Sequence, residues 1–222
     1  MYFPIKPFSL LKALLFCLAL VPLGRLGVGL ASYPEWLGAN PAEFIARSTG
    51  DWTLRFLLLT LAVTPVRKLS GWHEPARFRR MLGLFAFFYG VAHLASYLAF
   101  DHAFEALDIL KDIAERPFIT IGFTALVLMT PLAVTSTDAM VRRLGAKRWL
   151  ALHKLVYLIA PLGVLHFWWM VKKDVTEPAL YAVVLALLLG YRLVGKLADK
   201  RRRTGLVRGG PVRVSRIGAP VA

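Results

Sequence analysis

Long apolar runs alternate with short charged segments along most of the chain. Six of these runs are long enough, or nearly so, to cross the roughly 30 Å hydrocarbon core of a bilayer as helices. They cover residues 10–29, 52–66, 81–100, 117–136, 150–171 and 178–197. The pattern predicts an all-α membrane protein built as a six-helix transmembrane bundle. Residues 1–9 and a basic tail at 198–222 would flank this membrane domain at 10–197.

Composition and charge support this interpretation. Of the 222 residues, 57% are hydrophobic, and the net charge is +15. The basic residues separate the apolar runs instead of forming one basic face, which argues for a lipid bilayer and against nucleic acid as the partner. With the N-terminus inside, the inner segments hold 19 of the 28 basic residues and the outer loops hold five. The positive-inside rule therefore predicts that both termini are cytoplasmic.

The single cysteine limits the redox chemistry. Cys17 lies in an apolar run, so the chain has no internal disulfide, no Cys-x-x-Cys-His haem attachment and no set of cysteines for an iron–sulfur cluster. Any haem held by this chain would therefore be b-type.

Two histidines lie at matching depth in two predicted spans that run in the same direction. His93 is eight residues before Asp101, or about 12 Å, and His166 is six residues before Lys172, or about 9 Å. A neutral imidazole inside a bilayer needs a polar partner or a metal. We expect these two to ligate one haem iron from opposite sides. The alternative is that each only bonds to a neighbouring helix.

A glycine precedes each of these histidines by three residues, in GVAH (90–93) and GVLH (163–166). Residues three apart share a helix face, so Gly90 and Gly163 are expected to leave room for a porphyrin. The alternative is that both glycines only allow tight helix packing.

A third histidine, His153, lies near the cytoplasmic side. The corresponding position of the third span is Arg80, where a two-haem bis-histidine protein would have histidine. Arg79, Arg80 and Arg148 are suited to pairing with haem propionates. Either an inner haem has an unusual sixth ligand, or it is absent and His153 serves a flavin or a quinone.

The spacing of His153 and His166 presents a geometric difficulty. Thirteen residues at 100° each place the two side chains about 140° apart on a straight helix. Pro161 lies between them, and we expect a kink or a local change of winding there to bring the two ends into phase.

The connection between the third and fourth spans has apolar residues at helical spacing and is expected to lie along the membrane interface. It carries the acids Asp101, Glu105, Asp108, Asp112 and Glu115. We expect these acids to steer a soluble partner that carries a basic patch.

Three segments, 50–69, 79–97 and 131–174, resemble the MsrQ family, formerly YedZ. The longest is PLAVTSTDAMVRRLGAKRWLALHKLVYLIAPLGVLHFWWMVKKD, and the resemblance covers roughly residues 8–197. It implies a ferric-reductase-like transmembrane domain in the bacterial inner membrane.

The resemblance also implies a function. Proteins of this family are haem-binding electron-transfer subunits that take electrons from the quinone pool. They pass them to MsrP, a periplasmic molybdopterin enzyme that reduces methionine sulfoxide in oxidised proteins. The family's haem histidines fall on His93, His153 and His166. Bound FMN is implied by resemblance alone.

The electron donor is expected to be separate from this chain. Only about 25 residues follow the last span, and they contain no strand, glycine-rich turn and helix for a nucleotide. A membrane quinol or a cytoplasmic flavin reductase would therefore supply the electrons. Two alternatives stay open, namely a stand-alone ferric or quinone reductase, and a proton-coupled transporter that uses Lys154 and Arg192.

Overall fold

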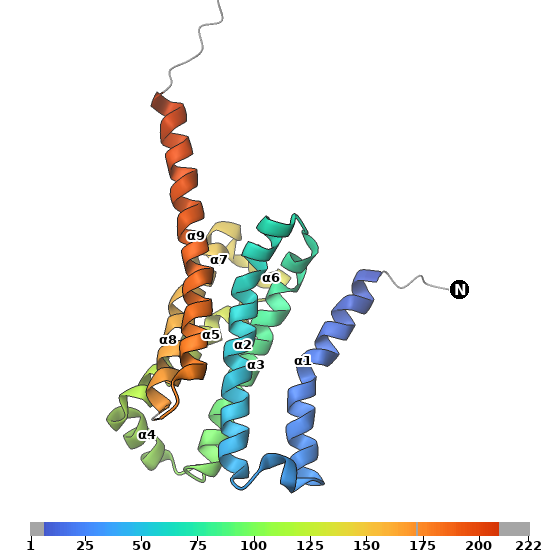
Figure 1. The fold of residues 1–222 in the computed structure, drawn as a ribbon, viewed down its shortest axis with the longest axis vertical. Helices are drawn as coiled ribbons and strands as arrows, with labels where there is room; N and C mark the ends of the chain where they lie inside the picture. Colours follow the sequence, from blue (N-terminus) through green and yellow to red (C-terminus); the bar gives the residue numbers. More distant parts are fainter. Residues whose placement is uncertain (1–6, 172, 209–222) are drawn as a thin grey trace, which may run out of the picture.

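The computed structural model describes residues 7–171 and 173–208, and every regular element in these ranges is a helix. Figure 1 shows their arrangement. The elements are α1 (Pro7–Ala31), η1 (Pro34–Leu37), α2 (Pro41–Ser70), η2 (Glu74–Phe78), α3 (Arg79–Phe100), α4 (Ala106–Glu115), α5 (Pro117–Val134), α6 (Asp138–Leu144), α7 (Ala146–Leu152), η3 (His153–Leu155), α8 (Val156–Met170) and α9 (Thr176–Arg208).

The long helices form one bundle with α2 at its centre. α2 packs against α1, α3, α8 and α9, while α5 packs against α3 and α8. The first and last described residues lie at the same end of the bundle, together with α6 and α7 (Figure 1). We call this the terminal end, and the opposite end, which carries η1 and α4, the loop end.

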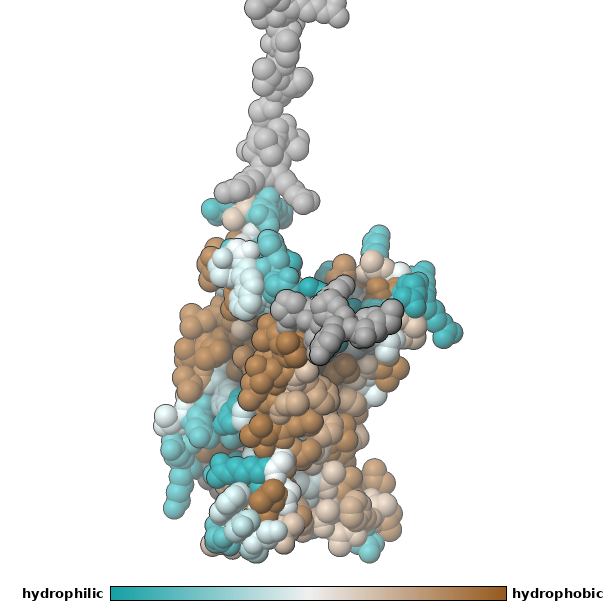
Figure 2. All heavy atoms as spheres, turned by 90° about the vertical axis from the view of Figure 1, so that its right-hand side faces the viewer, coloured by the Kyte–Doolittle hydropathy of each residue, from teal (hydrophilic) through white to brown (hydrophobic). Residues whose placement is uncertain are grey.

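The surface of the bundle fits a membrane. Within the described ranges, five helical segments are long and apolar enough to cross a bilayer: Ser9–Ala31, Glu74–Phe100, Pro117–Val134, Ala146–Met170 and Thr176–Arg201. Large apolar side chains such as Leu187 are exposed, at 69%, as expected where lipid replaces water. Hydrophobic residues cover most of the middle of the face in Figure 2. The chain is therefore a multi-pass membrane protein.

The predicted second span is not among those five segments. It lies within α2, which is less apolar than those five segments because it carries Asp51, Arg55, Arg67 and Lys68. The prediction also started this helix too late, at residue 52 instead of Pro41. The missed signal is a helix start, since Asn40 accepts a hydrogen bond from the Glu43 backbone N–H at 3.3 Å and proline follows it.

Two other boundaries differ from those predicted. α9 continues to Arg208, so residues 198–208 of the predicted tail are helical, in keeping with the high helix propensity of their Ala, Leu, Lys and Arg. Residues 209–222 of that tail, and 1–6 of the N-terminal segment, lie outside the described residues. The change of winding expected at Pro161 occurs instead at η3 (His153–Leu155), and α8 continues as an α-helix through Pro161.

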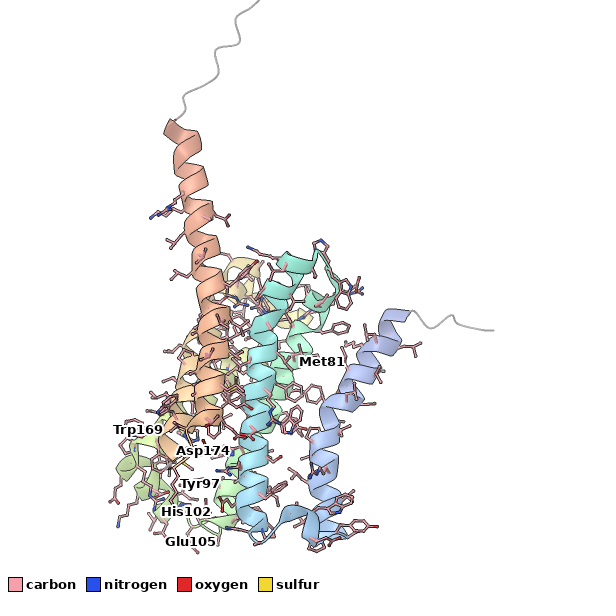
Figure 3. All side chains as sticks on the ribbon, viewed as in Figure 1. Met81, Tyr97, His102, Glu105, Trp169 and Asp174 are labelled. Carbon is pink, nitrogen blue, oxygen red and sulfur yellow. The ribbon has the colours of Figure 1, made fainter. Side chains whose placement is uncertain are left out.

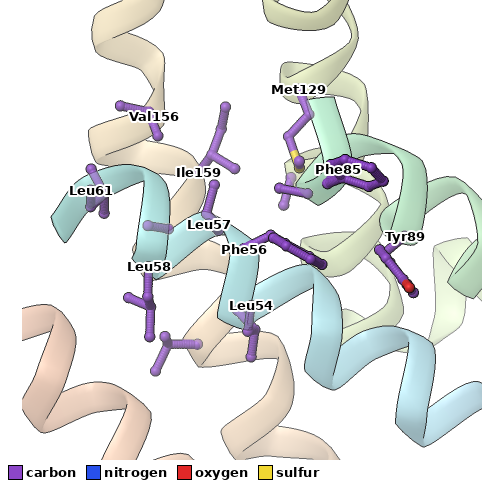
Figure 4. Packing of buried hydrophobic residues seen from close by; sticks show 14 of the residues in the cluster. Leu54, Phe56, Leu57, Leu58, Leu61, Phe85, Tyr89, Met129, Val156 and Ile159 are labelled. Atoms are coloured by element: carbon purple, nitrogen blue, oxygen red, sulfur yellow. The ribbon is translucent and has the colours of Figure 1, made fainter. Parts of the chain in front are cut away.

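The best-buried side chains lie where α2, α3 and α8 meet. Leu61, Ala86, Tyr89 and Ala160 have no exposed surface and Ile159 has 1%, and Figure 4 shows Leu61, Tyr89 and Ile159 in this cluster. Because lipid is as apolar as these side chains, close packing and interhelical hydrogen bonds hold such helices together, rather than removal from water.

One interhelical hydrogen bond compensates for a proline. Pro65 of α2 has no N–H, so the carbonyl of Leu61, four residues earlier, lacks its usual helical donor. The guanidinium of Arg192 on α9 donates to this carbonyl and lies 5.2 Å from the Tyr157 ring. This arrangement gives Arg192 a structural role, where the sequence had suggested proton coupling as an alternative.

We predict that Arg192→Met destabilises the bundle by about 1–3 kcal/mol, because the Leu61 carbonyl is left without a donor inside the bundle. Adding Pro65→Ala to this variant should recover most of the loss, since the substitution restores a backbone N–H that can donate to the same carbonyl. The measurement is denaturant unfolding of the purified protein in detergent. Equal stability of the single and double variants would contradict this pairing.

Candidate redox site and its surroundings

The structure brings two of the three predicted histidines together. His93 of α3 and His166 of α8 have ring centres 6.1 Å apart, with their planes at 73°. Both rings are partly buried between α2 and α5. Their matching depth, counted along the sequence, therefore corresponds to proximity in space.

A backbone carbonyl fixes the orientation of each ring. His93 Nδ1 lies 2.8 Å from the Ala46 carbonyl oxygen on α2, and His166 Nδ1 lies 2.7 Å from that of Phe118 on α5. A carbonyl only accepts, so Nδ1 of each neutral imidazole carries the proton and donates it. The lone pair is then on Nε2, the tautomer that a metal-binding histidine needs.

The same local device makes room for both rings. Gly50 comes four residues after Ala46, and Gly122 comes four residues after Phe118. A helical Cβ is tilted towards the helix N-terminus, over the preceding turn. A Cβ at Gly50 would lie 3.2 Å from the His93 ring, and one at Gly122 would lie 2.7 Å from His166 Nδ1. Glycine therefore lets each imidazole reach the carbonyl one turn earlier.

The sequence had pointed to a different pair of glycines. A Cβ at Gly90 would meet Leu126 at 3.0 Å and one at Gly163 would meet Leu54 at 3.0 Å, and no imidazole atom is among their nearest neighbours. In the structure these two glycines allow close packing between helices, with leucine side chains in the space beside them, and the prediction that they leave room for a porphyrin stays a prediction. The pattern of an acceptor followed by glycine four residues later was the missed signal.

The histidine pair fits a haem iron. Two metal–nitrogen bonds of about 2 Å, plus roughly 1 Å from each nitrogen to its ring centre, separate two axial imidazoles by about 6 Å, and the observed value is 6.1 Å. A bare structural metal ion usually needs four protein ligands. Among the described residues, no three His, Cys, Asp or Glu side chains are placed to share such an ion.

His153 lines a cleft of about 460 Å³ in the half of the bundle nearer the terminal end, a size typical of cofactor sites. Its Nδ1 bonds to the Trp149 carbonyl at 3.0 Å, and the two rings stack 3.8 Å apart. The buried Nε2 has no hydrogen-bond partner within the described chain. The indole N–H of Trp149 donates a 2.8 Å hydrogen bond to the Thr135 carbonyl. This bond fixes the Trp149 ring, and the ring in turn fixes the orientation of the His153 ring stacked on it.

Positive charge surrounds the cleft. The basic residues that line it are Arg79, Arg80, Lys147, Lys154 and Lys196. Arg80 also pairs with Asp138 at 2.5 Å, and this hydrogen bond holds the pKa of Asp138 below its usual value. Arg148, predicted to bind the same group as Arg79 and Arg80, is exposed and does not line the cleft. The chemistry of the cleft therefore favours an anionic ligand with a coordinating or hydrogen-bonding partner for His153.

At the loop end, α4 is fastened to the bundle through Asp112. This carboxylate accepts a hydrogen bond from Tyr97 at 2.7 Å and forms an ion pair with Arg116 at 2.7 Å, and His102 Nε2 lies 3.2 Å away. Figure 3 places Tyr97 and His102 here. Desolvation raises the pKa of Asp112, but the hydrogen bonds from Tyr97 and His102 and the charge of Arg116 outweigh it and lower the pKa overall. These contacts persist until the pH falls through that lowered value.

This arrangement corrects the predicted acidic cluster. Asp112 is buried and fully engaged, so it cannot attract a partner. Four acids of the predicted five stay exposed: Asp101, Glu105, Asp108 and Glu115. Beside them lie exposed apolar side chains, Phe104 at 66%, Leu107 at 83% and Leu110 at 65%. We call these seven residues the α4 surface.

Comparison with known proteins places the chain in a family. Residues 49–164 match the family described as ferric reductase like transmembrane component. A protein of Herminiimonas arsenicoxydans, named protein-methionine-sulfoxide reductase heme-binding subunit MsrQ, is 55% identical over 187 residues, which cover 83% of this chain and 85% of that protein. Proteins with the same name from Polaromonas naphthalenivorans (55% identical, covering 86% and 88%) and Ralstonia nicotianae (50% identical, covering 94% and 95%) agree.

The region matched by the family contains His93 and His153, as well as Gly50, Phe118 and Gly122. The alignments with the relatives extend over most of the chain. Identity at this level and coverage is far above what a shared fold alone requires. The chain belongs to the MsrQ family of ferric-reductase-like transmembrane proteins.

Proposed function

We propose that this chain is a membrane electron-transfer subunit in which His93 and His166 hold one b-type haem in the half of the bundle nearer the loop end. The observation that carries the proposal is the 6.1 Å separation of two imidazoles whose Nδ1 atoms are both bonded to carbonyls. The relatives' name, heme-binding subunit, supports it. When bound, haem supplies a one-electron carrier inside the membrane.

The chain's own residues determine the properties of this site. The carbonyls of Ala46 and Phe118 keep the protons on Nδ1 and make both Nε2 atoms better ligands. Gly50 and Gly122 set the distance from each ring to its carbonyl. The surrounding helices exclude water, which favours a ligand set without net charge.

A second anionic redox group is proposed for the cleft at His153, where the resemblance suggests either haem or FMN. Haem propionates and a flavin phosphate are both complementary to Arg79, Lys147, Lys154 and Lys196. The unpartnered His153 Nε2 would coordinate iron or bond to the flavin. With the terminal end cytoplasmic, as the charge distribution favours, electrons from a membrane quinol or a soluble flavin reductase would enter here.

Electrons would leave at the loop end, towards a periplasmic MsrP-type subunit that reduces methionine sulfoxide. The α4 surface suits a soluble protein partner, because an apolar centre with a charged rim is the usual make-up of an interface. Helices that lie on anionic membranes are instead rich in Lys and Arg, whereas here four exposed acids outnumber two exposed basic residues, Lys111 and Arg116. Sulfoxide reduction itself would take place on the partner.

The pairing of the histidines is tested by single substitutions. His93→Ala and His166→Ala should each abolish the same low-spin haem signal in the reduced-minus-oxidised spectrum and in haem quantification. His153→Ala should retain that signal, and so should the control His73→Ala, which is exposed between α2 and α3. A bis-imidazole spectrum that survives His93→Ala unchanged would show that the pairing is wrong.

The glycines give an independent test. Gly122→Ala should sharply reduce haem content, because its Cβ would lie only 2.7 Å from His166 Nδ1. Gly50→Ala, with 3.2 Å to the His93 ring, should reduce it less. Gly190→Ala, which has no neighbour within 4 Å, should leave haem content unchanged and is the matched control. Equal haem content in all three variants would mean that the glycines do not set the histidine geometry.

Neutralising the rim of the α4 surface should slow association with the partner. In the Asp101→Asn/Glu105→Gln/Asp108→Asn variant, we expect a lower rate at low salt and a weaker dependence on ionic strength. Stopped-flow oxidation of the pre-reduced protein by the purified partner measures both. Glu35→Gln, in η1 at the same end, is the control and should behave like wild type. A rate indifferent to salt and to the three substitutions would exclude α4 as the docking surface.

A further inference from the structure

A second cleft, which plays no part in the proposed electron path, lies between α1 and α2. Its volume is about 350 Å³. Its lining combines an apolar wall with four charged residues, Arg25, Arg47, Asp51 and Arg55. We call it the α1–α2 cleft.

The local structure of α1 explains why the cleft exists. Pro22 lies within the helix, which bends near its middle (Figure 1). The Tyr89 hydroxyl donates to the Ala19 carbonyl at 2.7 Å and accepts from the Leu23 N–H at 3.3 Å. These two groups are four residues apart and would otherwise bond to each other, so the hydroxyl has entered the helix ladder. A fully buried tyrosine of α3 thus fixes α1 at the bend, and the cleft opens beside it.

The charges in the cleft do not balance. Arg55 lies 3.5 Å from Asp51 and also donates to the Tyr181 hydroxyl at 2.9 Å. Asp51 is the one acid among the residues that line the cleft, so this pair leaves two guanidinium groups. Arg25 and Arg47 make no close ion pair or hydrogen bond within the described ranges, although the charges of Arg47 and of Glu177 on α9 also act on Asp51. The cleft therefore has an excess of two positive charges.

Both unpaired arginines lie at the same depth. Arg25 is six residues before the end of α1 at Ala31, and Arg47 is six residues after the start of α2 at Pro41. Each is therefore about 9 Å from the loop end of its helix. Both side chains are exposed, and guanidinium groups near the end of a membrane bundle are stabilised by an opposite charge or by water.

We propose that the α1–α2 cleft binds a phosphate group, carried by an anionic phospholipid. Guanidinium groups match phosphate oxygens in geometry and bind them through paired hydrogen bonds. Val21, Pro22, Leu26 and Phe44 provide an apolar wall along which an acyl chain lies. A quinol is neutral and would leave both arginines without a counter-charge.

Occupancy of this cleft bears on the histidine pair through α2. Arg47 directly follows Ala46, and Asp51 directly follows Gly50, in the turn of α2 that holds His93 in place. A lipid that bridges Arg25 and Arg47 also ties α1 to this turn. The lipid therefore stabilises the fold from a position next to the cofactor site without being part of it.

The test uses full-length protein, purified and delipidated in an uncharged detergent, with thermal melting followed by far-UV circular dichroism. The probes are dioleoyl phosphatidylglycerol, dioleoylglycerol with the same chains but no phosphate, and inorganic phosphate. Phosphatidylglycerol should raise the melting temperature in a saturable manner, and dioleoylglycerol should not. Arg25→Gln/Arg47→Gln should weaken the apparent affinity about tenfold or more. Arg143→Gln, an exposed arginine of α6, should not change it.

The outcomes separate the possible sources of the anion. Stabilisation by inorganic phosphate alone, lost in the double variant, would support the phosphate site and assign it to a soluble anion. If the double variant does not fold, Arg47→Lys keeps the charge but not the planar donor pair and should bind with intermediate affinity. Equal stabilisation of wild type and variants by phosphatidylglycerol, or stabilisation by a quinone analogue alone, would overturn the proposal.

Discussion

The site depends on one constraint, the contact between an imidazole N–H and a helix carbonyl, which occurs twice. A carbonyl within a helix is already bonded to the N–H four residues later, and its approach is normally covered by that residue's Cβ. At Ala46 and Phe118 the fourth residue is glycine, so a side chain from another helix can reach the oxygen. This requires α3 to lie close against α2, and α8 close against α5, as the structure has them. The packing of four helices is thereby linked to the tautomer of two histidines.

Two other interhelical hydrogen bonds follow the same principle, by which a side chain of one helix reaches the backbone of another. Arg192 donates a hydrogen bond to the Leu61 carbonyl, which Pro65 leaves without a helical donor. The Tyr89 hydroxyl bridges the Ala19 carbonyl and the Leu23 N–H of α1. Each proline or inserted side chain costs a helical hydrogen bond, and in lipid this loss has to be made good within the protein. Among the described residues, the buried side-chain nitrogens without a hydrogen-bond partner are His153 Nε2 and two nitrogens of the Arg192 guanidinium. His153 lines the cationic cleft, and Arg192 lies against Tyr157, which also lines it.

The sequence predicts how deep each histidine lies along its helix better than it predicts which neighbouring helix the side chain faces. A rise of 1.5 Å per residue places His93 and His166 at one level, and their proximity follows once their helices are neighbours. Which helix faces each ring depends on rotation and tertiary packing, so Gly90 and Gly163 were chosen for their place in the sequence, while Gly50 and Gly122 have the contacts. The turn at η3 was misplaced to Pro161 for a related reason, since a proline in a membrane helix does not by itself break the winding. The early start of α2, by contrast, could have been predicted from the Asn-Pro-x-Glu sequence at residues 40–43, which is typical of a helix N-terminus.

Electron paramagnetic resonance of the ferric protein reports on whether two imidazoles hold the haem and on the angle between their planes. Two axial imidazoles held by carbonyls on different helices, with planes at 73°, should give one low-spin haem with the strong anisotropy of nearly perpendicular ligand planes. We expect this signal to belong to the haem held by His93 and His166, and to be lost in His93→Ala and in His166→Ala. A high-spin signal, or a low-spin signal of the kind given by parallel imidazole planes, would contradict it.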